Sequence, residues 1–190
     1  MKIVSAPLPG VKIISPHFFH DHRGYFVETH SNDKFLEHGI DVEFVQDNLS
    51  FSAKKGTVRG LHFQIHPFAQ WKLISVVTGS VLDVAVDIRQ GSPSYGKYFE
   101  MIVDSENRNQ LLLPAGFAHG FVALENDTLV TYKVSAPYSP DHEKGIHWQD
   151  PDIAIDWPNR GGEAILSDRD RQLPKLADLP EYFTFSDGAA

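Results

Sequence analysis

The chain of 190 residues contains no cysteine, which removes several kinds of chemistry at once. Disulfide cross-links, thiolate nucleophiles and cysteine-ligated zinc sites are all excluded. A chain without thiols also fits a reducing compartment. Residues 1–9 have neither the apolar centre nor the cleavage site that a signal peptide needs. We therefore expect a cytoplasmic protein.

Long apolar runs and an excess of positive charge are also missing. No stretch approaches the roughly 20 apolar residues with which a helix spans a bilayer, so we expect no membrane partner. The chain has 17 lysines and arginines but 25 aspartates and glutamates, so its formal net charge is −8. Nonspecific nucleic-acid binding depends on cationic side chains that neutralise phosphates, so we expect no nucleic-acid partner either. A few local arginines can still bind a small diphosphate.

What the chain does contain is the pattern of a β-protein. Proline and glycine recur at about the 8–12-residue spacing of a sandwich or barrel, with Val, Ile, Phe and Thr between them. Only residues 32–37 and 175–179 favour short helical segments. No repeat or long linker divides the chain, whose length suits one domain. We predict strands at residues 57–64, 72–77, 80–89, 98–103, 109–113, 120–123 and 128–135.

The alternation of side chains along a strand predicts which residues share a face. The strand that contains Asp83 and Asp87 has one fully apolar face, and both aspartates lie on the other. The same rule puts Arg59 and His62 on opposite faces of their strand. A buried carboxylate must be paired, so Asp83 and Asp87 each need a partner.

His62, Lys72 and Tyr132 are each a polar group on a strand that otherwise has the composition of a buried one. Each has an ordinary explanation when taken singly. A strand histidine is usually a hydrogen-bonded core residue, a strand lysine usually reaches solvent, and a strand tyrosine usually keeps its hydroxyl at the rim. No function follows from any one of the three alone.

A more specific motif is Pro-x-Gly-x-x-His, which runs from Pro114 to His119. It resembles the second signature motif of the cupin superfamily and predicts a tight turn that delivers His119 to a barrel interior. The first cupin motif ordinarily supplies His-x-His and then Glu as metal ligands. Here Gln64 replaces the second histidine after His62, and no Glu follows before Lys72. A transition-metal site needs several converging ligands, so we expect a metal-free barrel without a cofactor.

The resemblance becomes narrower when nearly the whole chain is compared. A series of short stretches is similar, in order, to the dTDP-4-dehydrorhamnose 3,5-epimerase family, which performs the third step of dTDP-L-rhamnose synthesis. The similarity implies an all-β cupin jelly-roll barrel with a few short helices, as one domain over residues 1–190. Its core would lie at about residues 20–150, with segment 151–190 packed on it. The matching stretches are 21–28 (DHRGYFVE), 45–48 (VQDN), 58–64 (VRGLHFQ), 69–72 (AQWK), 82–89 (LDVAVDIR), 114–121 (PAGFAHGF), 131–133 (TYK), 138–143 (YSPDHE) and 166–170 (LSDRD).

The resemblance also implies a role for each candidate site residue. His62 would be the general base and Tyr132 the general acid. Lys72 would stabilise the enolate, and Asp170 would orient His62 or balance its charge. Tyr138 would stack near the base of the nucleotide. The other residues that would contact the sugar nucleotide are Arg23, Glu28, Gln46, Asn48, Arg59, His119, Glu143 and Arg169.

These side chains also suit the reaction on chemical grounds. A hydrogen on the carbon beside a ketone is a weak acid, so the enolate must be stabilised and a base must be held close. Histidine is matched to proton transfer near neutral pH, and lysine supplies positive charge at the oxyanion. Tyrosine can return a proton to the opposite face. The predicted reaction is epimerisation of a dTDP-4-keto-6-deoxyhexose at C3 and C5 through an enolate.

Two residue assignments stay open on the sequence alone. On the residues alone, Asp83 and Asp87 rival Asp170 as the partner of His62, because a buried carboxylate must be paired. Asp83 could also pair with Lys72 or join a network near a turn. The resemblance favours Asp170. Arg23 has the bidentate guanidinium that suits a diphosphate, but a loop salt bridge with a nearby carboxylate such as Asp21 is equally compatible with its position.

The resemblance further implies a homodimer, in which the N-terminal segment would contribute to the neighbour's site and paired barrels would cover exposed strand edges. Trp71 stands where a smaller residue is expected. Alternation points it away from Lys72, so we expect it to pack against a second subunit or the other sheet.

Three alternative functions remain. The first is an epimerase that acts at C3 or C5 only, which the sequence does not distinguish. The second is a noncatalytic sugar-nucleotide-binding cupin, which would be expected to lack His62 or Tyr132. The third is a metal-dependent cupin oxygenase or isomerase, against which Gln64 argues.

Overall fold

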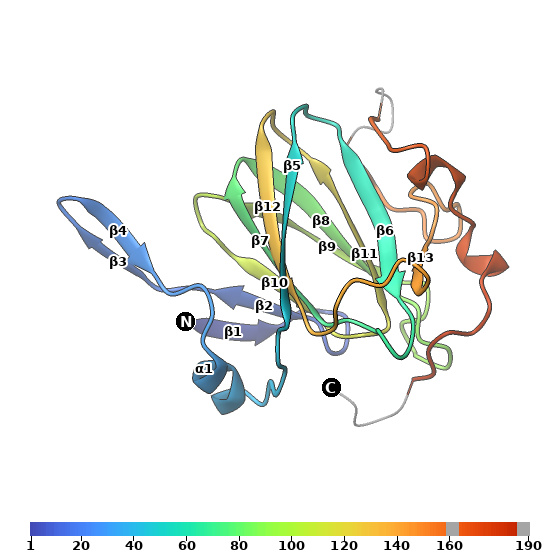
Figure 1. Cartoon of the computed structure of the whole chain (residues 1–190), viewed down its shortest axis with the longest axis horizontal. Helices are drawn as coiled ribbons and strands as arrows, with labels where there is room; N and C mark the ends of the chain where they lie inside the picture. The colour runs from blue at the N-terminus through green and yellow to red at the C-terminus, as the bar shows by residue number, and fades with distance from the viewer. Residues whose placement is uncertain (159–163, 186–190) are drawn as a thin grey trace.

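Antiparallel strands make up most of the structure, a computed structural model that describes residues 1–158 and 164–185. They form a six-stranded and a five-stranded sheet, with a separate two-stranded hairpin. Figure 1 shows the two larger sheets facing each other, as in a jelly-roll barrel, and this confirms the predicted all-β fold. The strands are β1 (Lys2–Ser5), β2 (Lys12–Ser15), β3 (Phe18–Asp21), β4 (Gly24–Val27), β5 (Gln46–Ser52), β6 (Val58–Gln64), β7 (Lys72–Thr78), β8 (Ser80–Asp87), β9 (Tyr98–Asp104), β10 (Gln110–Leu113), β11 (Phe117–Ala123), β12 (Thr128–Val134) and β13 (Glu143–Gly145); the helical segments are α1 (Asn32–Glu37) and the 3-10 turns η1 (Asp170–Gln172) and η2 (Leu176–Asp178).

The strand order decides which candidate residues lie on the same sheet. The six-stranded sheet has the order β1-β2-β10-β7-β12-β5, and the five-stranded sheet has the order β13-β6-β11-β8-β9. Lys72 on β7 and Tyr132 on β12 therefore belong to one sheet. His62 on β6 and His119 on β11 belong to the other, where they are direct cross-strand partners.

Apolar side chains fill two layers. The inner faces of both sheets meet in one cluster, which includes Ile74 and Val130 from the six-stranded sheet and Phe121 from the five-stranded sheet. A second cluster covers the outer face of the five-stranded sheet, where the C-terminal segment packs Trp157 and Phe183 against it. Of that predicted segment, residues 159–163 and 186–190 lie outside the described residues. β8 is buried on both faces because both layers use it.

Several element boundaries differ from those predicted. The strand predicted for residues 80–89 ends at Asp87, where the chain turns because the Asp87 carboxylate accepts hydrogen bonds from Ser92 and Ser94 at 2.6 and 2.7 Å. The strand predicted for 120–123 begins earlier, at Phe117. The predicted helix 32–37 is α1, and the predicted helical turn near 175–179 is η2. β1 to β5 and β13 were not predicted, because few of their side chains are buried and no apolar alternation marks them.

A β-bulge in β6 corrects the predicted placement of Arg59. His119 of β11 pairs with His62, whereas Phe121, two residues further along β11, pairs with Arg59, three residues back along β6. The extra residue breaks the alternation, so Arg59 and His62 both line the same pocket. Gly60 occupies the bulge with φ at 110°, and a Cβ there would lie 2.6 Å from the His119 carbonyl oxygen. The bulge therefore requires glycine.

The hairpin of β3 and β4 projects away from the barrel (Figure 1), and we call residues 16–30 the arm. Its Phe26 is 68% exposed and its Phe19 58%. Trp71 packs on a third cluster that includes Phe35 of α1 and Leu73, so its main contacts are not with the five-stranded sheet as one prediction had it. None of the described helices is long and apolar enough to cross a membrane.

Candidate active site

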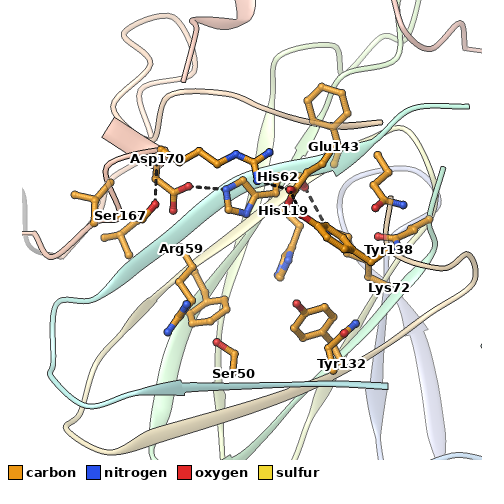
Figure 2. Close-up of a pocket in the computed structure, with 18 of the residues that line it drawn as sticks. Ser50, Arg59, His62, Lys72, His119, Tyr132, Tyr138, Glu143, Ser167 and Asp170 are labelled. Atoms are coloured by element: carbon orange, nitrogen blue, oxygen red, sulfur yellow. Dashed lines mark hydrogen bonds and ion pairs between the residues drawn. The ribbon is translucent and has the colours of Figure 1, made fainter. Parts of the chain in front are cut away.

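A cavity of about 480 Å³ opens between the two sheets and collects most of the predicted site residues. β5, β7 and β12 line it on one side, β6 and β11 on the other, and β13 and the chain before η1 lie at its rim. Figure 2 shows the labelled side chains pointing into this space from both sides. The predicted residues that line the cavity are Gln46, Asn48, Arg59, His62, Lys72, His119, Tyr132, Tyr138, Glu143, Arg169 and Asp170.

His62 of β6 is held by the carboxylate of Asp170, which begins η1. The distance from His62 Nε2 to Asp170 Oδ1 is 2.7 Å (Figure 2), and Asp170 is buried. Burial alone would raise the pKa of Asp170, but the bonds from His62 and from the amide of Gly60 lower it overall. An ionised carboxylate only accepts hydrogen bonds, so Nε2 carries the proton and Nδ1 is the basic nitrogen of the ring.

The rival carboxylate, Asp83 of β8, has a different partner. Both of its oxygens lie 3.0 Å from Nε2 of His119, and both side chains are buried. The two cavity-lining histidines, on neighbouring strands, are thus each held by a different aspartate, and the partner of His62 is Asp170.

Lys72 enters the cavity from β7 and is only 9% exposed. Its Nζ donates to the main-chain carbonyl of His62 at 3.3 Å. Burial lowers the pKa of Lys72 from 10.5 to about 8, although the carboxylates of Glu143 and Asp83 favour the charged form. The ammonium group therefore lies beside the base in a site where little water screens its charge.

Tyr132 lines the cavity from the sheet opposite His62 (Figure 2). Burial, followed by the nearby carboxylate of Glu143, raises the pKa of the Tyr132 phenol above its ordinary value of 10.0. The hydroxyl therefore keeps its proton at neutral pH and can donate it.

Polar side chains at the rim form a connected network. Gln46 Nε2 donates to Asn48 Oδ1 at 2.8 Å, and Gln46 Oε1 accepts from the amide of Tyr138 at 2.9 Å. The Tyr138 hydroxyl donates to Glu143 at 2.8 Å, and Arg169 forms an ion pair with the same carboxylate. The Tyr138 ring is 52% exposed, so one of its faces is available to a flat ligand.

Comparisons with known proteins identify the family of this chain. A family model described as dTDP-4-dehydrorhamnose 3,5-epimerase matches residues 5–178. The chain belongs to this family. A dTDP-4-dehydrorhamnose 3,5-epimerase of Sinorhizobium fredii is 49% identical over 185 residues, which are 97% of this chain and 94% of the relative.

Solved structures of this epimerase family superpose closely on the chain. The dTDP-4-dehydrorhamnose 3,5-epimerase of Bacillus anthracis, solved with TDP and PPi bound, has a TM-score of 0.89 and 45% identity, covering 92% of this chain and 98% of that one. The dTDP-6-deoxy-D-glucose-3,5-epimerase of Legionella pneumophila, in complex with dTDP-4-keto-L-rhamnose, has a TM-score of 0.92 and 41% identity, covering 97% of this chain and 98% of that one.

Arg23 and Glu28 are the two predicted site residues that do not line the cavity of this epimerase chain. Both belong to the arm. Arg23 pairs with Asp21 at 2.6 Å, as the alternative interpretation allowed, and Glu28 pairs with Lys34 at 2.6 Å. Within one chain they lie outside the site.

The sequence did not identify Ser50 of β5, which also lines the cavity. Its Oγ is buried and has no hydrogen-bond partner among the described residues, which marks it as a group that a ligand can satisfy. The signal was present, because Gln46, Asn48 and Ser50 follow one another at the two-residue spacing of a strand face. It was overlooked because that face is polar.

Gln64, which stands where metal-binding cupins have a histidine, bonds the main chain instead. Its Nε2 donates to the carbonyls of Phe68 at 2.8 Å and Pro137 at 3.1 Å, and its Oε1 accepts from the amide of Ser139 at 2.8 Å. Among residues 1–158 and 164–185, no group of three or more His, Cys, Asp or Glu side chains is arranged to hold a metal ion. Metal independence itself stays a prediction.

Proposed function

We propose that this epimerase converts dTDP-4-dehydro-6-deoxyglucose to dTDP-4-dehydro-L-rhamnose by inverting C3 and C5. The observation that carries the proposal is that an aspartate-held histidine and a phenol enter one cavity from opposite sheets. A planar enolate between them can lose a proton to one side and gain one from the other.

In the first half of the reaction, Nδ1 of His62 takes the hydrogen from the carbon beside the ketone. The electrons of that C–H bond form the enolate, whose oxygen becomes negative. The Lys72 ammonium stabilises this oxygen, and a fixed charge of this kind in a dry site is worth about 3 kcal/mol. Asp170 stabilises the imidazolium that His62 becomes.

In the second half, Tyr132 returns a proton to the opposite face of the same carbon, which inverts the centre and restores the ketone. The phenolate then regains a proton from solvent, and the His62 imidazolium releases one. One proton enters and one leaves, so no oxidant, reductant or cofactor is needed. Because both C3 and C5 lie beside the C4 ketone, the same groups can serve both centres.

The rest of the site suits a nucleotide diphosphate. Gln46 and Asn48 present amide groups that can bond a pyrimidine edge, and the exposed Tyr138 ring can stack on it. Arg59 supplies a guanidinium for the diphosphate. The bound dTDP-4-keto-L-rhamnose of the Legionella relative supports this choice of substrate.

A homodimer would complete the site. Leu49 and Phe51 on the outer face of β5 are 68% and 54% exposed, and the arm adds further exposed aromatic rings. Such apolar surface is typical of an interface. In the proposed dimer the arm reaches the cavity of the partner subunit, where Arg23 and Glu28 contact the nucleotide.

Incubation with dTDP-4-keto-6-deoxyglucose in deuterated buffer tests the function directly. We expect NMR to find deuterium at both C3 and C5 together with the L-rhamno product. Deuterium at one centre would replace the proposal with a single-centre epimerase. Binding of the nucleotide without exchange would indicate a noncatalytic cupin, and activity lost in chelator and restored by a metal ion would contradict metal independence.

A further inference from the structure

Asp83 is a fully buried carboxylate behind His119, which lines the cavity, and the proposed reaction assigns it no role. None of its surface is exposed. Among the described residues, its hydrogen bonds are to Nε2 of His119, which lies 3.0 Å from both carboxylate oxygens. Burying a carboxylate charge costs free energy unless the charge is paired, so the position of Asp83 needs an explanation.

The first consequence of this contact concerns the proton on His119. A carboxylate accepts hydrogen bonds and donates none, so Nε2 of His119 must carry a proton. In the neutral ring, Nδ1 is then an acceptor, and it belongs to a side chain that lines the cavity. Asp83 thus selects one of the two tautomers, as Asp170 does for His62.

The second consequence concerns charge. Glu143 of β13 and Asp83 of β8 are the carboxylates that favour the ammonium form of Lys72 against its burial. The other charged or titratable side chains that line the cavity are Arg59, His62, His119, Tyr132, Tyr138, Arg169 and Asp170. Glu143 has the larger effect on Lys72 and also bonds Tyr138 and Arg169 at the rim, whereas Asp83 is fully buried and bonds His119.

The place of this pair in the sheet connects both effects to the reaction. His119 is the direct cross-strand partner of His62, and the Lys72 Nζ bonds the His62 carbonyl. Groups that Asp83 controls therefore surround the ketone end of the sugar in the proposed complex, while the nucleotide end is bound by β5 and the rim.

We propose that Asp83 is a positioning residue that holds the Nε2 proton of His119 and places a negative charge near Lys72, so that the sugar ketone meets a fixed arrangement of donors and acceptors. This inference rests on the proposed function. In this proposal Asp83 itself contacts neither the substrate nor the proton that is transferred.

The test compares Asp83→Asn with Asp87→Asn. Asp87 is a matched control, because it lies four residues along the same strand, is equally buried, and bonds Arg89, Ser92 and Ser94 outside the cavity. Asparagine keeps the shape of Asp83 but removes the charge, and its amide can turn to donate to Nε2. We expect Asp83→Asn to lower kcat at least tenfold with KM within about threefold, and to move the basic limb of the kcat profile about one unit to lower pH.

Asp87→Asn should have a lower melting temperature and the pH profile of the wild type. If Asp83→Asn keeps the wild-type kcat and basic limb, the inference is overturned. Formate added to Asp83→Gly, which supplies a carboxylate in place of the missing side chain, should restore part of kcat.

A measurement on the unmodified enzyme covers the case in which the Asp83 variants do not fold. Nitrogen-15 NMR of labelled histidines, assigned by a His119→Gln variant, should show the Nε2–H tautomer for His119. A neutral His119 with its proton on Nδ1 would contradict the inference. If the wild type epimerises the substrate and Asp83→Asn has the same kinetics as Asp87→Asn, this inference is wrong but the proposed function stands. If the wild type shows no hydrogen exchange, the proposed function itself is wrong.

Discussion

Gly60 of β6 lies directly against the main chain of β11 at His119. A Cβ on Gly60 would come within 2.6 Å of the His119 carbonyl oxygen and 2.7 Å of the Gly120 Cα. The contact holds the bulge that turns both Arg59 and His62 into the cavity. The orientation of two cavity-lining side chains thus depends on a glycine, which has no side chain of its own.

We expect Gly60→Ala to destabilise the protein by about 3 kcal/mol or more, because the methyl group meets main chain and the φ of 110° is strained for alanine. Urea unfolding measures this change. Gly24→Ala is the matched control: its φ is 133°, but no atom lies within 4 Å of the place where its Cβ would be, so only strain remains. Equal losses for the two variants would show that close packing at Gly60 is unimportant.

Tyr132→Phe should separate proton removal from inversion. The base remains, so hydrogen beside the ketone is still abstracted, but no group donates from the opposite face. We expect solvent deuterium to enter with retained configuration, and product formation to fall at least 100-fold. NMR of the recovered sugar nucleotide distinguishes the two outcomes. Tyr138→Phe, which loses the bonds of its hydroxyl to Glu143 and Arg169 at the rim, should still invert the centre. Full inversion by Tyr132→Phe would remove Tyr132 from the proposed acid role.

We expect deprotonation of Lys72 to cause the loss of activity at high pH. Its pKa is lowered to about 8, first by burial, while the pKa of Tyr132 is raised, so Lys72 is the first of the two to lose its proton as pH rises. Activity should decline above about pH 8. Lys72→Arg keeps its charge throughout this range, so its activity, although lower, should not decline there. Lys133→Arg on the outer face of β12 is the control, and it should retain the wild-type limb.

The same lysine should cost the protein stability. A folded-state pKa of about 8 against 10.5 means that folding disfavours the ammonium form, by up to about 3 kcal/mol below pH 8. As pH rises from 8 to 10.5, the folded state releases the proton first and this cost disappears. Lys72→Met should therefore be more stable than the wild type near pH 7 in urea unfolding, by an amount that shrinks near pH 10.5. A less stable Lys72→Met protein at pH 7 would contradict this account of the shift.

Mixed subunits test the arm. Neither His62→Ala nor Arg23→Ala homodimers should be active, but a mixed dimer contains one site with His62 from one chain and Arg23 from the other. Random mixing should restore about a quarter of wild-type activity, because half of the dimers are mixed and one of their two sites is complete. Mixing His62→Ala with Arg59→Ala is the control and should restore nothing, since Arg59 and His62 line the cavity of the same chain. Recovery in both mixtures, or in neither, would argue against an exchanged arm.

Much of this site was predictable because it lies on strongly patterned strands. The apolar face of β8, the inward direction of Lys72 and Tyr132, and the turn before His119 all follow from alternation and turn chemistry, and the structure agrees with them. The sequence offered Asp83 and Asp87 as rivals of Asp170 for His62, and the family resemblance favoured Asp170. The fold decides between them, because η1 brings Asp170 to His62 across more than half of the chain.

What the sequence could not predict has identifiable physical causes. Strict alternation put Arg59 on the wrong face because a bulge has no reliable sequence signal beyond a glycine. β5 was missed because its inner face is polar and its outer face is exposed in a single chain. Arg23 and Glu28 lie in the arm, outside the cavity of their own chain, and only the proposed dimer would bring them to a site.

Gln64 connects the interior of the barrel to the loop at the cavity entrance through hydrogen bonds. The amide that stands in for a metal ligand fastens the loop on either side of Tyr138 to the strand that carries His62. Replacing Gln64 with histidine would remove these amide bonds and loosen the loop that presents Tyr138. The position of Tyr138 at the rim is therefore coupled to the identity of one side chain inside the barrel.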